Sequence, residues 1–300
     1  MMVTEANSLL PFIDAHHHFY DLERGDYQDM LGSGNPKYTE LFGDYSAIRR
    51  SYLIHDLLRD FEGSNVVKSV HAEAGWTGPD PVDETKLVQQ VADEFGFPHG
   101  IVAFTDLSKP GAATELERHC AYRNMRGIRV YWQDELLGHA EFERNLRVLG
   151  SLGLSCDLSA TWEAMRTARK LAEAHPKIQF ILGHTGWPRA RTEQYFRDWR
   201  EAMRVLAEAP NVAVKISGLG MGDHTWTPAS IRPWILETIA IFGTNRCMFA
   251  TNWPVDSLWS TFKFLVDTYR DTISTFAVEE QAKMLAGNAE RLYRLVDRPA

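Results

Sequence analysis

Short runs of apolar and β-branched residues alternate with longer stretches in which apolar residues recur every three or four positions. The short runs are typical of buried strands, and the longer stretches are typical of amphipathic helices that cover a sheet. The expected strands are 12–19, 66–74, 100–107, 125–132, 154–160, 178–186, 212–220 and 247–254. The expected helices are 47–62, 83–95, 112–121, 140–152, 162–175, 192–209, 228–242, 258–274 and, at the end, 278–295.

Eight strand–helix units in strict alternation indicate an α/β protein with a parallel sheet. Eight such units that close on themselves form a (β/α)8 TIM barrel. An open doubly wound sheet is the alternative, but no G-x-G-x-x-G turn follows the first strand. We therefore expect a single barrel domain over 1–300, with an extra helix at its carboxyl end.

The segment 20–46, between the first strand and its helix, breaks the regular alternation. Gly, Asp and Tyr each occur four times in it, and Pro once. A loop of this length in a compact domain usually has a function. We expect a lid over the barrel mouth that contacts the substrate, with a plain surface excursion as the alternative.

Composition narrows the class of partner. The 300 residues include 32 Lys and Arg against 40 Asp and Glu, a formal charge of −8, which argues against binding to nucleic acid or to an anionic membrane. No run approaches the ~20 apolar residues of a membrane span, and 1–11 lacks the pattern of a signal peptide. Three scattered Cys define neither a disulfide framework nor a zinc motif. We expect a cytoplasmic protein that acts on a small molecule; the oligomeric state stays open, a homo-oligomer included.

Polar residues stand where the first two expected strands end, which is where barrels place their chemistry. Alternation along a strand predicts that Asp14, His16 and His18 share one face. Two imidazoles so spaced can hold one metal ion or one substrate oxygen. In the second strand, the same rule puts His71 and Glu73 on a common face. A solvated strand end is the alternative for both groups.

The fourth, fifth and seventh strands carry further inward polar residues. Arg129 and Tyr131 alternate with apolar neighbours, and an inward Arg suits a substrate carboxylate. Asp157 faces inward in the same way. Lys215 lies in the middle of a strand, so it is expected to point inward and to pair with Asp157 or Glu73; an edge residue on a misassigned strand is the alternative.

Two more strand ends complete the candidate site. His184 follows an apolar strand and precedes a Gly turn, which predicts that it reaches the barrel mouth. Asn252 is expected inward at the end of the last strand, with Asp256 just beyond the turn. Aromatic residues that could form apolar walls are Trp76, Tyr131, Trp132, Trp187 and Trp253.

Four motifs resemble the amidohydrolase superfamily in order and spacing. They are D-A-H-H-H at 14–18, G-H-T-G-W-P at 183–188, K-I-S-G-L at 215–219 and A-T-N-W-P-V at 250–255. The branch of the superfamily that they resemble is that of predicted metal-dependent TIM-barrel hydrolases, which includes sugar lactonases and 2-pyrone-4,6-dicarboxylate lactonase. The resemblance implies that His16, His18 and His184 belong to the reacting centre. The resemblance also implies an acidic residue at the end of the eighth strand, but this sequence has Asn252 at that position.

That departure changes the expected chemistry, because Asn cannot accept a proton from water and is a weaker metal ligand than a carboxylate. The resemblance implies at most one divalent metal ion at His16 and His18, zinc first, and metal-free operation stays open. Glu73 is the first candidate for the general base, before His184 and Asp256.

The resulting hypothesis is a lactonase that opens a small carboxylated or sugar-derived lactone by attack of water. The catalytic residues would be His184, Glu73 and Asn252, and the substrate-binding residues would be Arg129, Tyr131, Lys215, Trp76, Trp187 and Trp253. The alternatives are a non-oxidative decarboxylase of an aromatic acid and a barrel that binds a ligand without catalysis.

Overall fold

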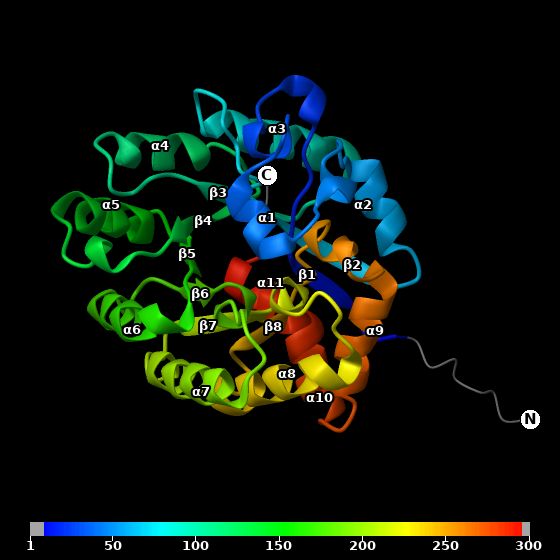
Figure 1. The fold of residues 1–300 in the computed structure, drawn as a ribbon. Coiled ribbons are helices and arrows are strands. Elements are labelled where there is room, and N and C mark those ends of the chain that lie inside the picture. The colour runs from blue at the N-terminus through cyan, green and yellow to red at the C-terminus, as the bar shows by residue number, and fades with distance from the viewer. Residues whose placement is uncertain (1–8, 296–300) are drawn as a thin grey trace, which may run out of the picture.

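Eight parallel strands stand side by side in chain order, and Figure 1 shows the helices around them. The computed structural model describes residues 9–295. The strands are β1 (Phe12–His17), β2 (Val66–Ala72), β3 (Gly100–Phe104), β4 (Met125–Tyr131), β5 (Ser155–Ser159), β6 (Phe180–Leu182), β7 (Val212–Ile216) and β8 (Cys247–Phe249). The amide of His18 donates to the carbonyl of Trp253 at 2.6 Å, so the chain beyond β8 meets the end of β1. The expected (β/α)8 TIM barrel is confirmed.

A helix follows each strand and covers the outside of the sheet. These helices are α2 (Ile54–Phe61), α3 (Val82–Phe95), α4 (Ala112–His119), α5 (Ala140–Ser151), α6 (Met165–Ala174), α7 (Glu193–Ala207), α8 (Pro228–Phe242) and α9 (Phe262–Thr272). Threonine side chains cap three of them: Thr192, Thr227 and Thr261 accept hydrogen bonds from backbone amides in the first turns of α7, α8 and α9. Such caps satisfy amides that have no partner within the helix. Among the described helices, none is long and apolar enough to cross a membrane.

The expected helix at the carboxyl end is present, but it is not continuous. It consists of α10 (Val278–Ala282), one π-helical turn at Lys283–Gly287 and α11 (Asn288–Tyr293). Leu292 and Tyr293 pack against inward residues of the strands, such as Ile13 and Met248. Figure 1 shows α11 in the middle of the ring of strands. This helix fills the barrel interior from the end at which the strands begin, so the interior opens at the carboxyl ends.

The long segment after β1 is folded rather than irregular. It contains α1 (Pro36–Phe42), which begins at a capping Asn35 and a proline in its first turn. The backbones of Tyr20 and Tyr52 exchange two hydrogen bonds, of 2.8 and 3.0 Å, and these join the two ends of the segment. The next helix begins at Ile54 rather than at the expected residue 47. The segment therefore stands on the barrel as a small, anchored unit.

The segment 1–11, on which the expectation about a signal peptide rests, lies mostly outside the described residues.

Candidate active site

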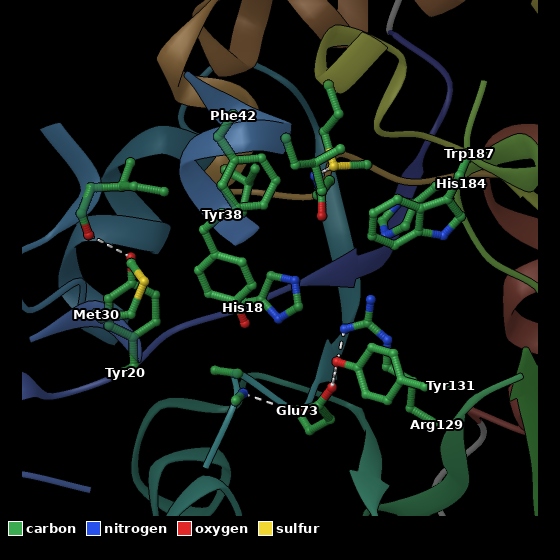
Figure 2. A pocket seen from close by; sticks show the side chains of 17 residues that line it. His18, Tyr20, Met30, Tyr38, Phe42, Glu73, Arg129, Tyr131, His184 and Trp187 are labelled. Carbon is green, nitrogen blue, oxygen red and sulfur yellow. Dashed lines mark hydrogen bonds and ion pairs between the residues drawn. The ribbon is translucent and has the colours of Figure 1, made fainter. Parts of the chain in front are cut away.

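Two adjoining cavities lie at the carboxyl ends of the strands. The larger has a volume of about 120 Å³, and its polar lining includes His18, Glu73, Arg129, His184 and Asn252. Figure 2 shows His18, Glu73, Arg129 and His184 around the same cavity as residues of the segment after β1, such as Tyr38 and Phe42. The smaller cavity lies deeper, and its lining includes His16, Asp157 and Lys215. Arg129 and His184 line both cavities.

A chain of hydrogen bonds links Lys215 to the two histidines of β1. The Lys215 Nζ lies 3.3 Å from His16 Nδ1, the two Nε2 atoms of His16 and His18 are 3.1 Å apart, and His18 Nδ1 lies 2.9 Å from the carbonyl of Ala72. An ammonium can only donate and a carbonyl can only accept. His16 therefore accepts at Nδ1 and donates from Nε2 to His18, and His18 donates from Nδ1 to Ala72.

The histidines of the site are neutral. Burial lowers the pKa of His16 and of His184 well below the usual value, and the positive charges of Lys215 and Arg129 act in the same direction. Burial likewise lowers the pKa of His18 to about 4. Neutral imidazoles can hydrogen-bond a substrate or ligate a metal, but at pH 7 they carry no charge for a substrate carboxylate.

His184 stands on an unusual stretch of backbone. Its φ is 50°, and Thr185 and Trp187 also have positive φ, of 56° and 54°. Such left-handed residues cost free energy and cluster at functional sites. His184 Nδ1 is 3.0 Å from the hydroxyl of Ser217. A Cβ atom at Gly218 would lie 2.8 Å from the same nitrogen, so only glycine leaves room for this imidazole.

Glu73 is a buried carboxylate with three donors. Its Oε1 accepts from Tyr131 at 2.6 Å and from Arg129 at 3.2 Å, and its Oε2 accepts from the amide of Gly75 at 2.9 Å. Burial alone would raise the pKa of Glu73, but the charge of Arg129 and the Tyr131 hydrogen bond outweigh burial and lower it. Glu73 is therefore ionised at neutral pH and lies in the cavity wall.

Lys215 is paired within the protein as well. Its Nζ lies 2.8 Å from Asp157 Oδ2, as the sequence predicts, and the hydroxyl of Tyr293 in α11 donates to the same oxygen. Only 1% of the Lys215 side chain is exposed. Each of the two cations in the site thus has its own carboxylate.

Asn252 and Asp256 form a pair at the end of β8. The Asn252 Nδ2 donates to Asp256 Oδ2 at 2.7 Å, and both side chains are buried. Burial raises the pKa of Asp256 to about 7, against the opposing effect of the Asn252 hydrogen bond. In the sequence, Asp256 lies just beyond the turn and is the last of the candidates for the general base. A 3-10 turn at Val255–Leu258 brings it back beneath Asn252.

Two predicted face assignments are wrong. In β1, Ile13 and Ala15 face the barrel interior, and the register shifts between Asp14 and His17. This irregularity returns His16 and His18 to the interior, whereas Asp14 bonds the amide and hydroxyl of Thr251 at 2.9 and 2.6 Å. Simple alternation could not predict the shift.

In β2 the inward residue is Val70, whereas His71 packs against Phe19 and His17 on the other face of the sheet. Glu73 reaches the cavity because β2 ends at Ala72 and the chain turns there. Glu73 and His71 therefore do not share a face.

The predicted tryptophan walls are only partly assembled. Trp187 lines the larger cavity. Trp76 packs edge-on against Tyr27 instead. The indole nitrogens of Trp132 and Trp253 donate to Thr167 at 3.1 Å and to Asp60 at 2.7 Å, respectively, and neither residue lines the cavity.

The rest of the wall of the larger cavity consists of residues that were not predicted individually from the sequence. Most of them lie in the segment after β1, and one, Met221, follows β7. The lining residues from the segment are Tyr20, Met30, Tyr38, Leu41, Phe42 and Ile48. The length of the segment predicted a lid, but no periodic signal marks which of its side chains point inward.

The arrangement does not suit a firm metal site. Among residues 9–295, no three His, Cys, Asp or Glu side chains are placed to hold one ion. Binding through both Nε2 atoms would require His16 to carry its proton on Nδ1, facing the ammonium of Lys215. A cation would also be repelled by that ammonium. The described residues thus supply two imidazole ligands at most.

The chain belongs to the amidohydrolase family, whose sequence pattern it matches over residues 13–295. It is 40% identical over 298 residues to the uncharacterized protein y4mH of Sinorhizobium fredii, covering 95% of this chain and 99% of that protein. It is 25% identical over 306 residues to an L-fucono-1,5-lactonase of Burkholderia ambifaria, covering 96% and 97%.

A crystal structure of an amidohydrolase of Burkholderia multivorans with bound zinc has the same fold. The TM-score is 0.82 at 24% sequence identity, and the alignment covers 95% of this chain and all of that one.

Proposed function

We propose that the protein hydrolyses a small cyclic ester, a lactone. The observation that carries this proposal is an ionised carboxylate, Glu73, fixed by Arg129 and Tyr131 in a cavity beside His18 and His184. Family membership and the similarity to a lactonase support the same reaction class. A lactone needs only an attacking water, a proton acceptor and donors for the carbonyl oxygen.

In the proposed mechanism, water attacks the carbonyl carbon of the ring. Glu73 takes a proton from this water, and its Oε2 has room for one because Gly75 is the single donor to that oxygen. N–H groups of Arg129 that do not point at Glu73 stabilise the negative charge on the carbonyl oxygen. The C–O bond of the ring then breaks, and the proton held by Glu73 passes to the departing alkoxide. The product is an open hydroxy acid.

The other polar residues hold the substrate in place. Because the Ser217 hydroxyl occupies Nδ1 of His184, the Nε2 atom of His184 remains free to contact the ester oxygens. Asp256 occupies one end of the Asn252 amide, so the amide oxygen can accept a hydrogen bond from the attacking water. His16 and His18 orient each other and keep Lys215 beneath the reacting centre. No step requires a metal.

Rates of acid release from a panel of lactones, together with carbon dioxide release from aromatic acids, test this proposal. We expect lactone opening, and we expect His184→Ala to remove most of it while the melting temperature stays within a few degrees. Release of carbon dioxide would favour the decarboxylase. Tight binding of lactones without turnover would favour the barrel that only binds.

A further inference from the structure

We propose that the substrate is an uncharged and largely apolar lactone: a single small ring that carries short alkyl substituents. This inference rests on the proposed lactone hydrolysis and deepens it. It departs from the carboxylated or sugar-derived lactone expected from the sequence. Three features of the larger cavity carry it: its lid wall, its internal charge balance and its size.

The wall that faces the catalytic groups is largely apolar, although Tyr38, which carries a hydroxyl, also belongs to it. Met30, Leu41, Phe42 and Ile48 present hydrocarbon or thioether surface to the cavity. The hydroxyl of Tyr20 is directed away from ligand binding, because it donates to the carbonyl of Ile48 at 2.7 Å. Figure 2 shows Tyr38 and Phe42 across the cavity from His184 and Trp187.

A polyhydroxylated ring would leave hydroxyls without partners on this side, and burying an unpaired hydroxyl is unfavourable. Short alkyl groups would gain free energy by leaving water there.

The charges of the site balance one another. Arg129 pairs with Glu73 at 3.2 Å, and Lys215 pairs with Asp157 at 2.8 Å. The hydrogen bonds from Lys215 to His16 and from His16 to His18 leave one proton on each of these rings, so neither ring adds a positive charge. A substrate carboxylate would therefore enter a partly buried site that has no uncompensated cation, and burying a charge without a partner is costly. A neutral ligand incurs no such cost.

Size limits the ligand to about one ring. The cavity volume is about 120 Å³. An engineered apolar cavity of about 150 Å³ in another protein holds one benzene molecule. A six-membered lactone with a short substituent fits the same scale, and a fused or two-ring substrate would exceed it.

The test compares three six-membered lactones that share a ring: one with an alkyl substituent, one polyhydroxylated and one with a carboxylate. We expect kcat/KM for the alkyl lactone to exceed the other two by at least a hundredfold. A preference for the hydroxylated or carboxylated lactone overturns the inference and leaves lactone hydrolysis standing.

Binding of the matching lactams, which resist hydrolysis, gives a second readout by calorimetry. Binding of the alkyl lactam without opening of any lactone would support the inference on ligand class and overturn the proposed hydrolysis. Failure of the alkyl lactam to bind overturns the inference.

Two variants sharpen the result. Leu41→Gln makes the half-buried lid wall polar, and it should lower kcat/KM for the alkyl lactone about tenfold. The matched control is Val278→Gln on α10, which is 60% exposed and far from the cavity lining, and it should change nothing. Equal effects of the two variants would overturn the role of the wall.

A further variant tests the charge balance of the site. Glu73→Gln leaves the positive charge of Arg129 uncompensated, so this variant should bind the carboxylated lactam at least tenfold more tightly than the wild type does. Affinity for the alkyl lactam should stay within about twofold. Unchanged affinity for the carboxylated lactam would overturn the charge argument.

Discussion

The Asn252 amide nitrogen donates a hydrogen bond of 2.7 Å to the carboxylate of Asp256, one turn further along the chain. The family resemblance implies an acidic residue at the position of Asn252. In this chain the carboxyl group belongs to Asp256 and lies behind the Asn252 amide instead. Asn252 itself has a positive φ of 58°, so both its backbone and its side chain are held in a defined orientation. The acid is thus kept close to the site but is withdrawn from the cavity wall.

The raised pKa of Asp256 predicts a particular dependence of stability on pH. Burial raises that pKa from an ordinary value near 3.8 to about 7, so between these values the folded protein holds a proton that the unfolded chain releases. The free energy of unfolding therefore falls as pH rises toward 7. An asparagine at position 256 cannot ionise, so the free energy of unfolding of the Asp256→Asn variant does not fall for this reason. From pH 5 to 7 the variant should gain about 2 kcal/mol relative to the wild type.

Chemical denaturation of both proteins at several pH values measures this difference. Other buried acids, such as Asp14, are common to both proteins and cancel in the comparison. A stability difference that stays constant with pH would contradict the account of Asp256.

Tyr131→Phe tests the assignment of Glu73 as the proton acceptor. The Tyr131 hydroxyl donates to Glu73 at 2.6 Å and helps to lower the pKa of this carboxyl against the opposing effect of burial. The acid limb of kcat/KM should lie below the ordinary Glu value of about 4.3 in the wild type. In the variant, the pKa of Glu73 rises, and the limb should move to higher pH by about half a unit to one unit. Tyr122→Phe is the control, and a limb that does not move in Tyr131→Phe would exclude Glu73 as the titrating base.

Asn252→Asp tests the account of the metal. A carboxylate at this position would add a third ligand beside His16 and His18, and carboxylates bind divalent ions better than amides do. We expect weak zinc binding by the wild type and at least tenfold tighter binding by the variant, measured by competition with a coloured chelator. Asn245→Asp, at an exposed position, should bind zinc as the wild type does. Tight binding by the wild type would contradict the conclusion drawn from the ligand set.

The sequence predicts the barrel because eight strand–helix units repeat one simple pattern. Arg129, Lys215 and His184 could be found from the same pattern, since each is a polar residue within or just after a largely apolar strand. The faces of β1 and β2 could not be predicted, because a register shift depends on how neighbouring strands pair.

The helix in the lid, by contrast, has readable signals: Asn35 and Pro36 mark its beginning, and Gly43 follows its end. The Asn252–Asp256 contact depends on a turn that only the folded structure reveals.

In the proposed mechanism, Glu73 accepts a proton from the water that opens the lactone. The most direct measurement is the initial rate of alkyl-lactone opening at pH 7 by the wild type, by Glu73→Gln and by the exposed control Glu193→Gln. We expect kcat to fall by roughly 10² to 10⁴ in Glu73→Gln, as for the loss of a general base, and to stay unchanged in the control. A Glu73→Gln protein that opens the lactone at the rate of the wild type would contradict the account.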